Sequence, residues 1–110
     1  MIELSKNEEF ILLAIWMLKD NAYGVTIRSK VMEASQKTLH YGSLYNTLDL
    51  LMKKKLVTIK ESKPQSFRGG RRKKLYFLTD DGSRALNAAI QVYKTVWNNI
   101  KEFTFAFDND

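Results

Sequence analysis

The residues with the clearest chemical potential are cations gathered in one window. Ten of the eighteen Lys and Arg residues lie between Lys53 and Lys74, with a single acid, Glu61, so this window carries +9. The rest of the chain carries −3, and the net charge of +6 therefore hides a slightly acidic body. Concentrated positive charge is typical of surfaces that bind the phosphates of nucleic acid, although many Lys-rich runs are only solvated surfaces.

Catalytic chemistry has little support in the sequence. The chain has no cysteine and a single histidine, His40, so it lacks a thiolate nucleophile and a cysteine-based metal site. The pair Gly69-Gly70 indicates a turn and does not form a glycine-rich phosphate loop. We therefore expect a protein that is not an enzyme and that needs no cofactor or metal.

Length and composition predict one folded domain. With 110 residues, 45% of them hydrophobic and 12% aromatic, the chain can bury a single core and is not expected to be disordered. Its start lacks the basic segment of a secretory signal, and its longest apolar run, residues 10–18, is too short to cross a bilayer. A cytoplasmic protein without membrane association is the expectation.

The elements that must position the cations follow from periodicity and capping. Ser5 and Glu8 have the spacing of a capping box, which starts a first helix that runs to about Lys19. A second helix covers about residues 24–35, and a third begins near Ser43, which is placed to cap it. Residues 56–61 and 74–78 have the alternation of strands, and the turn residues between them predict a hairpin with a long loop.

A long fourth helix carries the pattern of a dimerisation seam. Thr79 is placed as its cap, and apolar residues then recur at heptad spacing up to Ile100. If this helix reaches Phe103, it is too long to bury its seam against so small a body. The first helix is apolar on nearly all sides, so we expect a homodimer to cover both helices. The predicted interface residues are Ile11, Ile15, Leu86, Ile90, Tyr93, Trp97 and Ile100.

The order of three helices, a hairpin and a helix predicts the winged helix-turn-helix fold, a mainly α architecture with one small hairpin. In that fold the third helix enters the major groove and the hairpin loop, the wing, reaches the flanking backbone. The predicted division is a DNA-binding unit at 1–79, a dimerisation helix at 80–107 and a frayed tail at 108–110.

The predicted DNA-binding residues lie on the polar face of the third helix, at its basic end and in the wing. They are Tyr41, Ser43, Tyr45, Asn46, Lys53, Lys54, Arg68, Arg71, Arg72 and Lys73. Tyr45 lies between two core leucines, so it either contacts DNA or packs on the second helix. For Asp49, a salt bridge to Lys53 one turn later is favoured over a contact with a cytosine amine.

Two motifs carry a resemblance to a known family. Gly42-Ser43-Leu44-Tyr45 opens the third helix, and Gly70-Arg71-Arg72-Lys73 leads through the second strand to Leu78-Thr79 and Gly82. Together with Tyr23-Gly24, they resemble the PadR family of bacterial transcriptional regulators from about residue 10 to residue 86. The chain departs from the family at Asn46, where proline is common, and at Lys74-Leu75, where two aromatics are usual.

The resemblance implies a homodimeric repressor of the short subfamily, which pairs through the C-terminal and first helices and binds a pseudo-palindromic operator in double-stranded DNA. Multidrug-sensing members place an aromatic at the position of Tyr93. Tyr93 and Trp97 either pack within the dimer or line a central cavity for a small aromatic, hydrophobic or cationic effector. The alternative function is a winged-helix interaction or dimerisation module without specific DNA binding.

Overall fold

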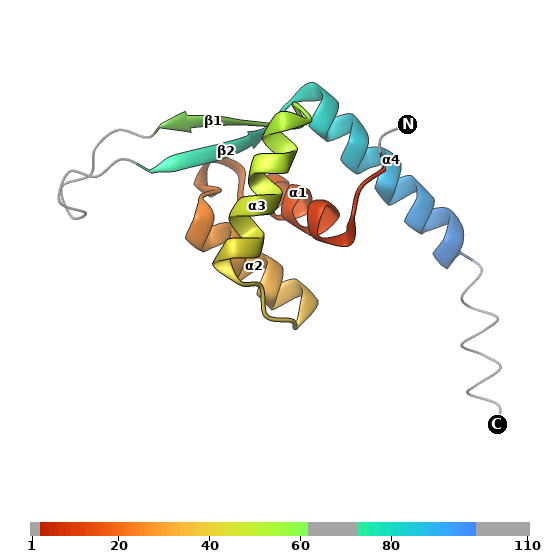
Figure 1. Ribbon diagram of the computed structural model, residues 1–110. Coiled ribbons are helices and arrows are strands. Elements are labelled where there is room, and N and C mark those ends of the chain that lie inside the picture. The colour runs from red at the N-terminus through yellow and green to blue at the C-terminus, as the bar shows by residue number, and fades with distance from the viewer. Residues whose placement is uncertain (1–2, 62–72, 99–110) are drawn as a thin grey trace.

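The computed structural model describes residues 3–61 and 73–98. Its elements are α1 (Lys6–Leu18), the 3-10 turn η1 (Lys19–Asn21), α2 (Gly24–Ser35), α3 (Tyr41–Lys53), β1 (Val57–Glu61), β2 (Lys74–Leu78) and α4 (Asp80–Trp97). The two strands form an antiparallel hairpin that projects from one side of the helical body, and α4 leads away on the other side (Figure 1). The predicted fold class, a winged helix-turn-helix with a further C-terminal helix, is confirmed.

The capping box predicted at the start of α1 is present. The Ser5 hydroxyl accepts a hydrogen bond from the Glu8 amide at 3.2 Å, and the Glu8 carboxylate accepts one from the Ser5 amide at 2.8 Å. These bonds satisfy two amides that have no partner inside the helix. The helix ends at Leu18, beside the predicted end, and α2 has the predicted bounds.

The prediction that Ser43 caps α3 is wrong. The helix already begins at Tyr41, with His40 as an extended cap residue whose side chain makes no capping bond. The Leu44 amide donates to the His40 carbonyl at 3.0 Å, which places Ser43 inside the first turn. A good capping residue type thus lies three positions after the observed cap residue, inside the helix.

The end of α3 is a Schellman motif built without glycine. The Leu56 amide donates to the Leu51 carbonyl and the Lys55 amide to the Met52 carbonyl, both at 3.0 Å. Lys55 adopts the left-handed φ of 61° that this motif needs at its turning residue. The turn directs Leu56 into the core and starts β1 one residue later than predicted.

The hairpin is tied to the helices at its base. Val57 pairs with Leu78 and Glu61 with Lys74, so the strands are in register along their whole length. The amide of Tyr76 donates to the Ala22 carbonyl at 2.8 Å, which connects β2 to the turn before α2. The wing therefore leaves the body from an anchored base.

The start of α4 lies directly against the end of α3. The Thr79 hydroxyl accepts from the Gly82 amide at 3.0 Å, as predicted for a cap, and donates to the Lys55 carbonyl at 2.7 Å. A Cβ atom at Gly82 would overlap the backbone carbonyl of Leu56, so this close approach requires glycine.

One core joins α1, α2, α3, the hairpin and the first turns of α4. Its buried members are Ile11, Leu12, Ala14, Ile15, Ala22, Ile27, Val31, Leu39, Leu44, Leu48, Leu51, Leu56, Val57, Tyr76 and Leu86. Three of them, Ile11, Ile15 and Leu86, were predicted to form the dimer interface. They are 0%, 2% and 6% exposed in the single chain, so they pack within the protomer, and their part in a dimer interface stays a prediction. No helix among the described residues is both long and apolar enough to span a membrane.

Candidate nucleic-acid interface

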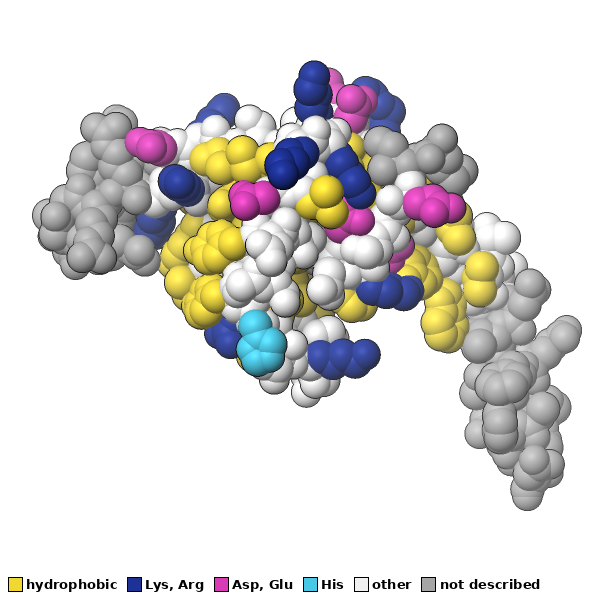
Figure 2. Space-filling model, viewed as in Figure 1, with side chains coloured by type: hydrophobic (Ala, Val, Ile, Leu, Met, Phe, Trp, Pro, Cys, Tyr) yellow, Lys and Arg dark blue, Asp and Glu magenta, His cyan; other side chains and the backbone are white. Residues whose placement is uncertain are grey.

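The outer face of α3 carries two exposed aromatic side chains among polar ones. Its inner face is formed by Leu44, Leu48 and Leu51, which are buried, and the face opposite them is therefore turned to solvent. Tyr41 and Tyr45 are 42% and 45% exposed and lie at the edge of that face, next to α2. In Figure 2, hydrophobic side chains gather on the visible face between the hairpin and the helices, with Lys and Arg around them. The predicted contacts Ser43 and Asn46 are also exposed on α3.

The sequence left two alternatives for Tyr45, contact with DNA or packing on the second helix, and its position is compatible with both. Its ring stacks on that of Tyr41, with the centroids 6.3 Å apart and an angle of 19° between the planes. Its hydroxyl lies so close to Gly24 that a Cβ atom there would collide with it. Tyr45 thus packs on the start of α2 and still presents almost half of its surface to solvent.

The lysines at the C-terminal end of α3 differ in exposure and in partners, although they are adjacent in sequence. Lys53 is exposed, as predicted for a phosphate contact. Lys54 instead donates to the buried carboxylate of Glu8 at 2.7 Å, and its side chain is only 32% exposed. Lys54 thus has a charged partner within the protein, whereas its role as a DNA contact stays a prediction. The partners are 46 residues apart in sequence, so no local spacing indicates the pair.

Of the wing, the structure describes both strands and Lys73, and residues 62–72 between the strands lie outside the described residues. Lys73, which precedes β2, places its ammonium 4.4 Å from the centre of the Tyr23 ring, a cation–π contact that joins the base of the wing to the turn before α2. The predicted contacts Arg68, Arg71 and Arg72 lie outside the described residues. The strands that lead to them run side by side from the end of α3 (Figure 1).

The electrostatics of this face include one acid and one buried phenol. Burial raises the pKa of Tyr76, and the nearby Tyr45 and Asp49 raise it further. Asp49 therefore lies close to the junction of α3 with the hairpin. Among the residues that the structure describes, no ion pair joins Asp49 to Lys53, so the favoured salt bridge is absent there.

Arg28 is a residue that the sequence did not single out for this face. Its Nε–H donates to the Leu39 carbonyl at 2.5 Å, and its guanidinium lies 4.5 Å from the centre of the Tyr41 ring. Arg28 is half-buried on α2, where sequence indicated only a polar side. The signal that could have found it is an arginine one helical turn after Gly24, on the same face of α2.

A second surface lies between the start of α1 and the exposed side of α4. It is a groove of about 510 Å³, open to solvent and lined mainly by small and apolar side chains. The lining residues are Glu3, Leu4, Lys6, Glu9, Ala85, Ala88, Ala89, Val92, Tyr93, Val96 and Trp97. Tyr93 and Trp97, the two predicted ligand residues, therefore line one groove.

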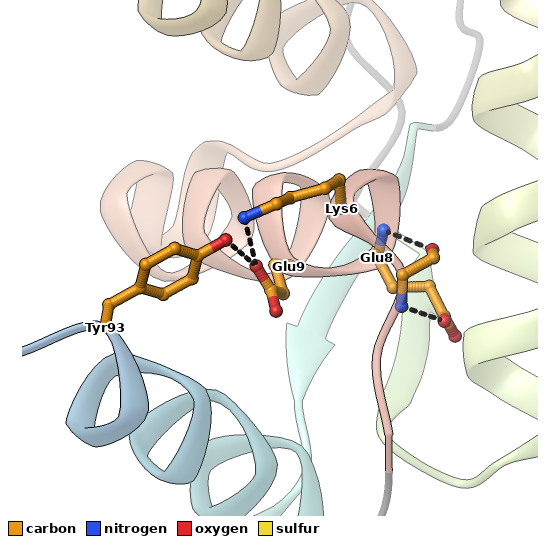
Figure 3. A network of polar contacts seen from close by, with 5 residues as sticks. Lys6, Glu8, Glu9 and Tyr93 are labelled. Atoms are coloured by element: carbon orange, nitrogen blue, oxygen red, sulfur yellow. Dashed lines mark hydrogen bonds and ion pairs between the residues drawn. The ribbon is translucent and has the colours of Figure 1, made fainter. Parts of the chain in front are cut away.

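Polar contacts hold Tyr93 within this groove (Figure 3). The Tyr93 hydroxyl donates to the Glu9 carboxylate at 2.9 Å, and the Lys6 ammonium approaches the same carboxylate at 3.9 Å. Lys6 also lies 4.0 Å from the centre of the Tyr93 ring. The aromatic ring is thus fixed between a carboxylate and an ammonium.

The predicted seam on α4 divides into two parts. Leu86 is buried, and Ile90 packs against the core of the same chain, so this half of the seam is used within the protomer. Trp97 is 54% exposed, and Val92 and Val96, next to the predicted seam, are exposed as well. Ile100 lies outside the described residues. The open apolar stripe is therefore displaced from the heptad positions toward the alanine and valine side of the helix.

Within residues 3–61 and 73–98, no group of His, Asp or Glu side chains is arranged to hold a metal ion. The features that converge on a surface are thus cations, tyrosines and hydrogen-bonding side chains on α3 and at the base of the wing.

The comparisons with known proteins agree with this geometry. A family model described as "Transcriptional regulator PadR-like family" matches residues 12–88. No curated protein matches the chain. A PadR family transcription regulator from hypervirulent Clostridium difficile is 28% identical with a TM-score of 0.67, covering 87% of this chain and 97% of that one. A PadR-like transcriptional regulator from Bacillus cereus is 25% identical with a TM-score of 0.74, covering 88% and 89%.

A more distant structure bears on the fold alone. A winged-helix DNA-binding protein from STIV is 19% identical with a TM-score of 0.66, covering 86% of this chain and 95% of that one. The family match extends from α1 into α4 and includes both motifs, and the family consists of transcriptional regulators and not of enzymes. The chain belongs to the PadR-like family of transcriptional regulators, and its fold is the DNA-binding winged helix.

Proposed function

We propose that this protein is a homodimeric repressor that binds a pseudo-palindromic operator through α3 and the wing. The observation that carries the proposal is the exposed part of α3, with Tyr41, Tyr45 and Asn46, on the helix that leads directly into the hairpin. The hairpin leads into the arginine-rich segment of the chain. In a twofold dimer, half-sites read by two such helices would lie one helical turn, or ~34 Å, apart.

The charge distribution supports separate roles for two groups of side chains on this surface, one for base contacts and one for phosphate contacts. Hydrogen-bonding side chains occupy the exposed face of α3, where they can reach base edges. The cations Lys53, Lys55, Lys60 and Lys74 are exposed around that face, and the remaining cations of the basic window lie in the wing. Phosphate contacts by these cations set affinity and register, whereas α3 sets sequence preference.

The test separates these two contributions. Replacing Arg71 and Arg72 by Ala should weaken binding to every duplex and flatten the dependence of log K on log salt by about two phosphate contacts. Replacing Asn46 by Ala should instead change the preferred sequence and leave the salt slope alone. Arg84→Ala is the matched control, because Arg84 lies on α4 and pairs with Asp81. Parent-like binding by both variants, measured at several salt concentrations, would rule out this surface.

The groove on α4 supports a second part of the proposal, which is release of the operator by a small aromatic or hydrophobic effector. Its volume of about 510 Å³ lies in the range of small-molecule sites, and Tyr93 and Trp97 supply flat apolar surface. Since α4 also carries the exposed stripe of Val92 and Val96, a second copy would close the groove. An effector bound between two copies would change the angle between their winged helices.

The competing function is a winged helix that serves only for protein interaction. Such a module would bind its partner with little dependence on salt and without need of Arg71 or Arg72. The exposed tyrosines of α3 fit either function, so the salt dependence and the selection of a sequence are the discriminating measurements.

A further inference from the structure

We propose that Arg28 is a positioning residue for DNA recognition, holding the two exposed tyrosines of α3 in one orientation through stacking and a hydrogen bond. The inference rests on the proposed binding of DNA by α3. It assigns to Arg28 a role that differs from a phosphate contact, since the shape of the guanidinium matters and its charge alone does not suffice.

Arg28 contacts two segments on the path from α2 to α3. Its Nε–H donates to the carbonyl of Leu39, in the connection between the helices, at 2.5 Å. Its guanidinium carbon lies 4.5 Å from the centre of the ring of Tyr41, the first residue of α3. One half-buried side chain thus fixes both the backbone before the helix and the first aromatic ring on it.

The tyrosines continue the stack back to α2. Tyr41 stacks on Tyr45 at 6.3 Å between centroids, and the Tyr45 hydroxyl lies against the backbone of Gly24. Gly24 and Arg28 are four residues apart and therefore on the same face of α2. The aromatic pair is held at one end by a guanidinium and at the other by a bare stretch of helix backbone.

Fixing these rings before DNA arrives favours discrimination between sequences. A free tyrosine on a helix surface samples several rotamers. Ordering such a side chain when DNA binds costs conformational entropy, which reduces the free energy of binding. Held rings present their hydroxyls, which can donate and accept hydrogen bonds, at defined places on α3. Base edges must be met at defined places, whereas the phosphate field acts over a range of positions.

Lysine cannot replace arginine in this arrangement. The guanidinium is planar, stacks on an aromatic face and donates sideways to a carbonyl at the same time, whereas an ammonium is a compact point charge. Arg28→Lys therefore keeps the charge and removes the geometry. A phosphate contact would survive this change, and a positioning contact would not.

The experiment compares two duplexes of equal length and composition, one selected from a random library by the parent protein and one scrambled. For Arg28→Lys we expect an affinity for the selected duplex about tenfold lower, as for the loss of one good base contact. The affinity for the scrambled duplex and the salt slope should stay at the parent values. Arg84→Lys is the matched control and should leave both duplexes unaffected, because Arg84 is an exposed residue of α4.

Two results would overturn the proposal. Parent-like discrimination by Arg28→Lys would show that the guanidinium geometry is not needed. An equal loss on both duplexes would assign Arg28 to the phosphate backbone instead. If the parent selects no duplex at all, the proposed function itself fails, which is a separate outcome from a failure of Arg28 alone.

A double-mutant comparison keeps the inference testable if Arg28→Lys lowers the stability of the fold. Tyr41→Leu removes the ring on which Arg28 stacks, so adding Arg28→Lys should then cause no further loss of discrimination. Additive losses would contradict the proposal. The Arg28 Nε–H signal in NMR spectra should also move when the Tyr41 ring is removed, and an unmoved signal would contradict the stacking itself.

Discussion

The Glu8 carboxylate joins two segments that are far apart in the sequence. One oxygen accepts from the Ser5 amide at 2.8 Å and the other from the Lys54 ammonium at 2.7 Å, so the start of α1 is joined to the end of α3. Burial alone raises the pKa of Glu8, but the hydrogen bond and charge of Lys54 and the bond from Ser5 outweigh it, and the pKa is lowered overall. The folded protein therefore favours the ionised form.

Replacing Glu8 by Gln should lower the free energy of unfolding by about 1–2 kcal/mol at neutral pH, because Lys54 loses its charged partner but can still turn toward water. The parent gains this contribution fully above the unfolded pKa of about 4.3, and loses it as pH falls through the lower folded pKa. Urea unfolding of the two proteins should thus converge toward low pH.

Glu33→Gln is the matched control, because Glu33 is exposed on α2. A constant difference in unfolding free energy between parent and Glu8→Gln from neutral to acidic pH would contradict the assigned role of the ion pair.

At the scale of elements, the junction of α3, β1 and α4 depends on backbone approach. Thr79 bonds to both the Lys55 carbonyl and the Gly82 amide, and Gly82 lies directly on the carbonyl of Leu56. The hairpin and α3 are therefore positioned by the same few residues that start α4.

Gly82→Ala and Gly42→Ala form a matched pair of helix substitutions. At Gly82 the added methyl meets backbone, so we expect a loss of about 2 kcal/mol in the free energy of unfolding. At Gly42 the methyl points into open space, and alanine should stabilise α3 by about 0.5 kcal/mol. Both changes in the free energy of unfolding are measured by urea denaturation, as shifts of the transition midpoint at an unchanged dependence on urea concentration. Effects of the same sign would show that the contact with Leu56 does not govern the junction.

At the scale of the whole molecule, the two surfaces lie on different parts of the fold and are connected through α1. Glu8 pairs with Lys54 at the end of α3, and its neighbour Glu9 accepts from Tyr93 in the α4 groove. Figure 3 shows both carboxylates near the start of α1. A partner or effector that moves α4 against α1 would therefore act next to the ion pair that joins α1 to the end of α3.

Trp97→Asp should convert the proposed dimer into monomers, because it places a charge in the exposed apolar stripe of α4. Sedimentation velocity measures the change, with Gln91→Asp on a polar, exposed position of the same helix as control. A dimer that persists in Trp97→Asp would exclude this role for the stripe.

In a Trp16→Phe background, Trp97 is the only tryptophan, and a planar aromatic dye bound in the groove should quench its emission. Emission that the dye leaves unchanged would contradict the binding of an aromatic ligand in the groove.

The local features of this protein were determined by its sequence. The capping box of α1, the cap of α4 and the strand alternation each depend on a few adjacent residues, and Ser5, Glu8 and Thr79 act as their spacing predicts, whereas α3 begins before the predicted cap Ser43. The concentration of cations between Lys53 and Lys74 likewise follows from composition alone. The family motifs at Gly42-Ser43-Leu44-Tyr45 and at the wing were sufficient to indicate the fold.

Tertiary structure decided which chemical groups remain available. A heptad pattern does not distinguish packing within a chain from packing between chains, and Ile11, Ile15 and Leu86 pack within the single chain. Charge counts do not reveal that Lys54 is neutralised by a carboxylate 46 residues away. The stack of Arg28 on Tyr41 likewise exists only because the turn after α2 brings two helices together. Such pairings depend on the packing of distant segments, which no short window of sequence encodes.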